Sequence, residues 1–181
     1  LREQDEVKQT IIPVDLTFTL KHLEKSLLSF GADYQHASYE TFAEVGGIST
    51  KGNDATDYNV GIYAQEELVF DKWVIRAGGR YDDTKNTYDL LGGTVPQISD
   101  KSWSKFLWSG GIKFNATEQL SLYSNGGSSF LVPSAKSVGG TLKISDLGVP
   151  GMNGQLPNPN LKPESGIGLD GGINYSPLKN L

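Results

Sequence analysis

The sequence predicts an all-β fold: an antiparallel meander of about seven strands that crosses a membrane as a segment of a larger β-barrel. Apolar and polar side chains alternate with a period of two in about seven stretches of the chain. Most of these stretches have roughly the ten residues that a tilted strand needs to span a bilayer. The connections between them alternate between short and long, as they do in outer-membrane barrels.

The first stretch shows the pattern, because Val14 and Leu16 alternate with Asp15 and Thr17. The same alternation predicts seven strands, at about residues 13–22, 28–35, 58–70, 73–82, 103–115, 120–133 and 167–175. In the third of these strands Glu66 falls on the apolar face, which predicts a β-bulge nearby.

The segments without alternation predict the connections. Short turns fall near residues 24, 71 and 117. Polar or glycine-rich segments are predicted to be loops, namely residues 1–10, 40–57, the stretch around Gly92-Gly93 and the longest one, about 134–163. Aromatic residues stand beside the short turns, where an interfacial girdle belongs: Phe70, Trp73, Phe114 and Tyr175.

Composition excludes several classes of protein. Hydrophobic residues make up 37% of the chain, and no apolar run is long enough for a transmembrane helix. The absence of cysteine excludes a disulfide scaffold and thiolate metal sites. A net charge of −5 gives no electrostatic reason to expect nucleic acid as a partner. The first residues are charged and precede no apolar segment, so we expect a chain without a signal peptide.

No catalytic pattern is visible. The sequence has no Gly-x-Ser-x-Gly turn, and His22 and His36 belong to no motif; both fall on the apolar face near strand ends. Glu66 and Glu67 are adjacent, so on a strand they point to opposite faces and cannot share a substrate. We therefore expect neither an enzyme nor a protein that binds a metal or another cofactor.

Three segments are informative as a group. Phe130-Leu131-Val132-Pro133 is followed by a variable loop and by a proline-rich motif that leads into the last strand, Asn158-Pro159-Asn160-Leu161-Lys162-Pro163-Glu164. Upstream, residues 61–67 read Gly-Ile-Tyr-Ala-Gln-Glu-Glu and residues 77–82 read Ala-Gly-Gly-Arg-Tyr-Asp. In this order, over roughly residues 58–176, they resemble the barrel of TonB-dependent outer-membrane receptors.

The resemblance implies a wall of 22 strands around an N-terminal plug, in the outer membrane of a Gram-negative bacterium. Residues 1–181 would then be a partial barrel without the plug domain and the terminal strands. The implied partners are outer-membrane lipid, a scarce nutrient, and the TonB complex, which is contacted through the absent plug.

A ferric siderophore or other iron complex is the first choice for the nutrient. Heme is disfavoured, because Leu131 replaces the arginine of the heme-receptor box and residues 134–157 contain no histidine. Cobalamin or another nutrient stays open, and so does a passive, porin-like or structural outer-membrane barrel. A soluble sugar-binding β-domain is the other alternative, although it does not require that short and long connections segregate.

The polar face of the predicted strands would line the lumen, with these side chains: Asp33, Gln35, Tyr63, Gln65, Glu67, Arg76, Arg80, Lys105, Lys113, Tyr123, Asn125, Asp170 and Asn174. Arg80 and Tyr123, placed closer to the outer rim, are the candidates for binding the substrate. The alternative is that most of these side chains pair with one another across strands.

The loop at about 134–163 is the second candidate region, because long structured loops usually have a function. Its predicted substrate contacts are Gly139, Gly140, Met152 and Asn153. The motif Asn158–Glu164 is predicted to be structural, with its prolines fixing the return of the loop to the wall.

Overall fold

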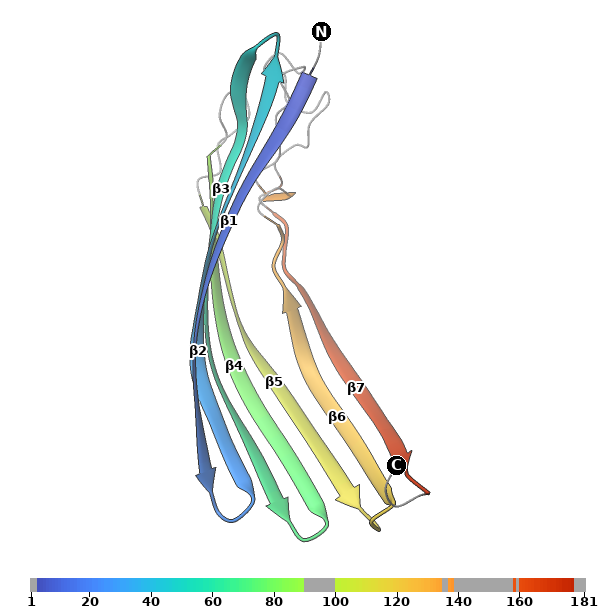
Figure 1. Cartoon of the computed structure of the whole chain (residues 1–181). Coiled ribbons are helices and arrows are strands. Elements are labelled where there is room, and N and C mark those ends of the chain that lie inside the picture. The colour runs from blue at the N-terminus through green and yellow to red at the C-terminus, as the bar shows by residue number, and fades with distance from the viewer. Residues whose placement is uncertain (1–2, 90–99, 135–136, 139–157, 159, 178–181) are drawn as a thin grey trace.

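The computed structural model describes residues 3–89, 100–134, 137–138, 158 and 160–177 of the chain. Seven strands form one antiparallel sheet, in which each strand pairs with its neighbours in sequence (Figure 1). Their bounds are β1 Glu3–His22, β2 Ser26–Val45, β3 Ile48–Phe70, β4 Trp73–Asp89, β5 Asp100–Asn115, β6 Leu120–Leu131 and β7 Glu164–Tyr175. The predicted antiparallel meander is therefore confirmed.

The sheet is open, because β1 and β7 lie at its two edges and do not pair with each other. Within the described ranges, no helix is both long enough and apolar enough to span a membrane.

The two faces of the sheet differ in chemistry. Residues that stand opposite each other on neighbouring strands share a face, and one such row joins Leu16, Ala32, Ile62, Tyr81 and Phe106. We call this side the apolar face. Its large, exposed side chains include Val14, Leu16, Phe18, Leu20, Phe30, Tyr34, Val60, Ile62, Phe70, Trp73, Tyr81, Phe106, Trp108, Ile112, Leu122, Ile167, Leu169, Ile173 and Tyr175. So continuous an apolar surface needs an apolar environment.

The other side, the polar face, holds every residue that the sequence predicted there. One row joins Asp33, Gly61, Asp82 and Lys105 across four strands. On the apolar face, two aromatic residues of the predicted girdle lie together, because the rings of Trp73 and Phe114 pack with centroids 4.5 Å apart.

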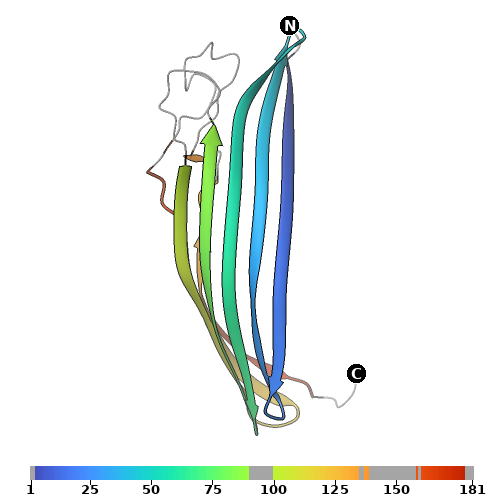
Figure 2. The same cartoon turned by 90° about the vertical axis from the view of Figure 1, so that its left-hand side faces the viewer.

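Two predicted loops are strands instead. Residues 3–10 pair with the end of β2, and β2 and β3 continue through the segment 40–57 to a tight turn at Gly46-Gly47. Both glycines have positive φ, of 63° and 83°, which side chains other than glycine rarely adopt. The first even-to-odd connection is therefore short. Figure 2 shows β1 to β3 reaching beyond the other strands at this end.

Two further details of the prediction need correction. No bulge occurs at Glu66, which stands in regular register between Leu28 and Ala77; the irregularity lies between Thr41 and Phe42. The fourth strand continues to Asp89, seven residues beyond its predicted end, and the loop predicted around Gly92-Gly93 lies outside the described residues.

β5 and β6 pair over only part of their length. Their ladder ends at Ser109 and Gly127, and beyond it the Trp108 backbone N–H donates to Ser128 Oγ at 2.9 Å. From there the two strands diverge, as Figure 1 shows. β5 continues along β4 while β6 continues along β7, so the chain after β6 can leave the plane of the wall.

Candidate functional site

Arg80 is held between two aspartates on the polar face. Its Nη1 and Nη2 donate to the two carboxylate oxygens of Asp33 on β2, at 2.5 and 2.8 Å. Its Nε donates to Asp82 on the same strand at 2.8 Å, and Nη2 lies 2.6 Å from that carboxylate. Most of the guanidinium donors are thus already used, and the forked geometry is the strong, bidentate kind.

A glycine makes this arrangement possible. Gly61 stands between Asp33 and Asp82 in the register, and the Arg80 side chain lies across it. A Cβ at this position would lie 2.5 Å from Arg80 Cζ and 2.9 Å from Asp33 Oδ2. The bare backbone of Gly61 therefore provides the space in which the ion-paired cluster forms.

Tyrosines on the polar face also lie across glycines of a neighbouring strand. Tyr63 lies over Gly31 and its hydroxyl meets Thr17 Oγ1 at 2.5 Å, two strands away. Tyr123 lies over Gly172, where a Cβ would come within 2.8 Å of the ring. Long side chains of the polar face thus lie along the wall instead of projecting from it, which leaves the space in front of the wall free.

Tyr123 is not near the outer rim, contrary to the prediction. It is the fourth residue of β6 and therefore lies close to the end with the short turns. Arg80 is near the middle of β4. The two candidates for substrate contact consequently lie at different depths, and the structure does not bring them together.

Other charged residues of the polar face pair across strands. Glu67 accepts from Arg76 Nε at 2.5 Å, and Asn125 donates to Asp170 at 3.0 Å. The alternative prediction, that polar-face side chains pair with one another, holds for these residues. Within the described part of the chain, no group of three or more acidic or histidine side chains could hold a metal ion.

The apolar face carries ion pairs that the sequence did not reveal. On the apolar face, His22 Nε2 and Glu66 Oε1 are 2.7 Å apart, so the acid in the apolar row has a partner. At the outer end, Lys51 contacts Glu40 and, at 2.5 Å, Asp54. These hydrogen bonds, above all that to Asp54, raise the pKa of Lys51 above its ordinary value.

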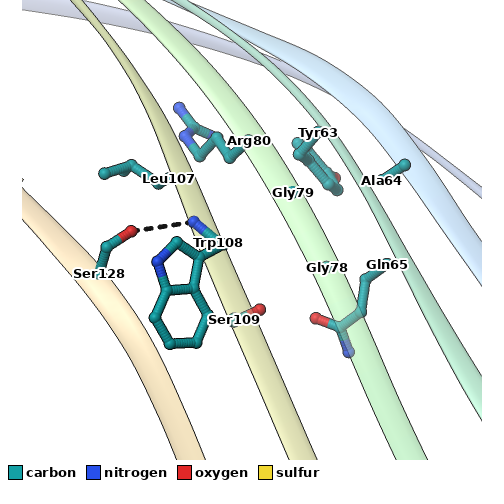
Figure 3. Close-up of a pocket in the computed structure, with 10 residues that line it drawn as sticks. All are labelled: Tyr63, Ala64, Gln65, Gly78, Gly79, Arg80, Leu107, Trp108, Ser109 and Ser128. Atoms are coloured by element: carbon teal, nitrogen blue, oxygen red, sulfur yellow. Dashed lines mark hydrogen bonds between the residues drawn. The ribbon is translucent and has the colours of Figure 1, made fainter. Parts of the chain in front are cut away.

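A shallow hollow of about 380 Å³ lies beside Arg80 on the polar face. Figure 3 shows side chains arranged around the bare backbone of Gly78 and Gly79. A Cβ at Gly78 would meet Ser109 Oγ at 2.9 Å, so this glycine sets the depth of the hollow. Its lining consists of Tyr63, Ala64, Gln65, Gly78, Gly79, Arg80, Leu107, Trp108, Ser109 and Ser128.

The proline-rich motif ties the base of the longest loop to the wall. The Asn158 backbone N–H donates to the Val138 carbonyl at 3.0 Å, and Asn160 N–H donates to Asn158 Oδ1 at 3.2 Å. Leu161 packs on a small core formed by Val138, Ala55 of β3 and Tyr88 of β4. Val138, shortly after β6, therefore packs on the polar face of β3 and β4.

The rest of the motif is placed in part. Lys162 and Pro163 lead into β7, which begins at Glu164, directly after the predicted end of the loop at residue 163. Gly139, Gly140, Met152, Asn153 and Pro159 lie outside the described residues.

The register of the sheet, its two faces and the docked loop base point to the wall of a membrane barrel, and comparison with known families agrees. The family described as TonB dependent receptor-like, beta-barrel matches residues 3–181. The chain belongs to the TonB-dependent receptor family. Its members are outer-membrane transport receptors rather than enzymes, and they take up nutrients in partnership with TonB. No curated protein sequence matches the chain.

Membership assigns each face of this receptor wall. The apolar face contacts the lipid of the outer membrane, and the polar face lines the lumen. The turns that join β1 to β2, β3 to β4 and β5 to β6 then lie on the periplasmic side. The β2–β3 hairpin lies on the outer side, because its strands continue beyond the roughly ten residues that cross the bilayer.

Proposed function

We propose that this chain forms part of a larger barrel, of about 22 strands, that imports a scarce nutrient. The seven described strands leave two unpaired edges, and an open edge is not stable in lipid. Further strands must therefore close the barrel, and a plug domain would fill its lumen and contact TonB. The flattened polar face supports this proposal, because side chains that lie along the wall leave room for such a domain.

The proposed substrate is an iron complex, most simply a ferric siderophore. Leu131 and the lack of histidine in residues 134–157 both argue against heme as the ligand of this loop. No chemistry on the substrate is required, which agrees with the cross-strand pairing of the polar-face acids and bases.

The substrate contacts that we propose lie mainly in the loop that follows β6. Its base is held by the Asn158–Val138 hydrogen bond and by Leu161, so the motif acts as a structural anchor. Gly139, Gly140, Met152 and Asn153 of this loop would meet the substrate. Arg80 and Tyr123 remain proposed contacts deeper in the lumen, and Arg80 would act through the few donors that Asp33 and Asp82 leave free.

Uptake by whole cells tests the proposal. The intact receptor would be expressed in cells with and without TonB, and the import of radiolabelled iron chelates and of cobalamin would be measured. We expect import of an iron chelate that requires TonB, and loss of import with normal antibody labelling at the surface after deletion of residues 139–154. Import without TonB would instead favour a passive porin. Import of cobalamin alone would assign another nutrient, and unchanged import by the deletion variant would exclude the loop.

A further inference from the structure

A second cavity, of about 330 Å³, lies on the polar face at the outer end of the sheet. We call it the wall pocket. It is formed by β1, β2 and β3 together with the start of the loop after β6, and its lining residues are Gln9, Ala37, Ser38, Tyr39, Ala55, Asp57 and Ser134. Gln9, Tyr39 and Ala55 stand opposite one another in the register, and Asp57 stands opposite Ala37.

The position of the wall pocket along the strands, measured from their periplasmic ends, places it outside the membrane. Gln9, Tyr39 and Asp57 are all more than ten residues away from the periplasmic ends of their strands, at His22, Ser26 and Phe70. About ten residues suffice to cross the bilayer. The wall pocket therefore opens at the outer mouth of the lumen, under the docked base of the loop, where a substrate from outside arrives.

The lining is rich in hydrogen-bond acceptors. Asp57 contributes a carboxylate, Gln9 an amide, and Tyr39 and Ser134 hydroxyl groups, while Ala37 and Ala55 leave the space open. This combination of a small apolar floor and a few convergent polar groups is typical of ligand sites.

Asp57 is the unusual residue of the wall pocket. It is half-buried, and within the part of the chain that the structure describes it has neither a hydrogen bond nor an ion pair. Burial raises its pKa above the ordinary value of an aspartate, with only a smaller opposing effect of His36. His36 lies on the apolar face, where its ring packs at a tilt against Tyr58. Lys101 faces the lumen two strands away and forms no ion pair with Asp57.

Beside Asp57 is a further buried hydrogen-bond acceptor without a partner, Asn86 Oδ1. Asn86 stands directly opposite Asp57, and Tyr88 stands opposite Ala55. Asn86 is 1% exposed; its Nδ2 donates to the Pro133 carbonyl at 3.5 Å, whereas its Oδ1 has no hydrogen-bond partner. Buried polar groups are normally paired, so the unpaired Asn86 Oδ1 opposite Asp57 indicates that a hydrogen-bond donor is missing beside the cavity.

We infer that the wall pocket binds a neutral or cationic, hydrogen-bond-donating part of the imported substrate, such as a protonated amine or a group of hydroxyls. The inference rests on the proposed function and adds the charge class of the substrate. The three negative charges of three hydroxamate groups balance the charge of Fe(III), so a ferric tris-hydroxamate is uncharged. If such a chelate also carries a free amine, which is protonated at neutral pH, it is cationic. Three catecholates leave a strongly negative complex, which the Asp57 carboxylate repels.

Binding to the intact receptor in detergent tests this inference. The probes are an amine-bearing ferric tris-hydroxamate, an uncharged ferric tris-hydroxamate and a ferric tris-catecholate, each titrated by quenching of tryptophan fluorescence. The variant is Asp57→Asn. Its matched control is Asp54→Asn, on the same strand but on the apolar face beside Lys51.

We expect the wild-type receptor to bind the amine-bearing probe most tightly. Asp57→Asn should weaken that binding about tenfold, as loss of one charge-assisted hydrogen bond does, and should change binding of the uncharged probe much less. Asp54→Asn should bind all probes as the wild type does. If a chelate binds but Asp57→Asn leaves the preference among the probes unchanged, the wall pocket is not the site. If none of the probes binds, the iron-chelate proposal fails, and the inference fails with it.

Discussion

Substitution of Gly61 tests whether the Asp33–Arg80–Asp82 cluster stabilises the wall. In Gly61→Ala the new Cβ would lie 2.5 Å from Arg80 Cζ and 2.9 Å from Asp33 Oδ2, whereas ordinary contacts begin near 3.4 Å. The guanidinium must therefore move by about an ångström, and the two hydrogen bonds to Asp33, at 2.5 and 2.8 Å, cannot both survive.

The expected cost follows from those two bonds. Hydrogen bonds to charged groups contribute about 1.5–3 kcal/mol each when buried. The Arg80 side chain is 33% exposed and Asp33 20%, so solvent screening reduces the loss to roughly 2 kcal/mol in total. Gly168→Ala is the matched control, because Gly168 shares the polar face and a Cβ there would meet nothing within 4 Å.

The assay is urea unfolding of the intact receptor, followed by the heat-modifiable mobility of the folded barrel on a gel. Gly61→Ala should lower the free energy of unfolding by roughly 2 kcal/mol, and Gly168→Ala should leave it within about 0.5 kcal/mol. In an Arg80→Gln background, Gly61→Ala should cost much less, since the pair is already broken. Equal effects of the two glycine variants, or full additivity with Arg80→Gln, would refute the role of Gly61.

Three further outcomes are expected. Leu169→Arg, on the lipid-facing side of β7, should lower the free energy of unfolding of the barrel by about 2–4 kcal/mol in urea titrations in liposomes. Asp170→Asn should change it little, and equal losses of stability in the two variants would contradict the assignment of faces. Leu161→Asp should detach the loop base from its core and speed external proteolysis of the loop on whole cells without loss of the barrel, and unchanged proteolysis would contradict the anchor. Burial raises the pKa of Tyr88 from 10.0 to about 12, so the stability that its protonated hydroxyl contributes is present below pH 10 and is lost as the pH rises toward 12. In an ultraviolet titration, the tyrosine step at the highest pH should therefore disappear in Tyr88→Phe. A titration curve that the substitution leaves unaltered would be inconsistent with this burial.

The membrane-spanning part of the fold could be predicted from sequence because lipid imposes a strict pattern. Where one face contacts lipid and the other the lumen, every second residue must be apolar, and Leu16, Ile62 and Leu169 follow that rule. The positions and faces of the strands there were therefore correct.

Outside the membrane the same pattern disappears although the strands continue. Both faces are wet in that region, so residues 3–10 and 40–57 carry no alternation, and polarity alone resembled a loop. What holds them is the backbone ladder between β1, β2 and β3. The usable signal was the Gly46-Gly47 dipeptide, a common turn in two-residue hairpins.

For the candidate site, the sequence could predict which residues share the polar face but not which of them are in contact. Arg80 and Asp33 are 47 residues apart, and their pairing depends on a register that the sequence does not state. Likewise, Gly31 and Gly61 became informative only when Tyr63 and Arg80 were found lying across them. Asp57 lies in the segment 40–57 that was predicted to be a loop, and only the strand places it in one pocket with Ser134.

Spin labelling tests the central claim, that this sheet is a membrane wall with one lipid-facing and one lumen-facing side. The chain has no cysteine, so single cysteines can be placed in turn at residues 167–174 of β7 in the intact receptor reconstituted in liposomes. Labels at the odd positions should be accessible to oxygen dissolved in lipid, and labels at the even positions to a water-soluble nickel reagent. A profile without this alternation, or with the two reagents exchanged, would contradict the account.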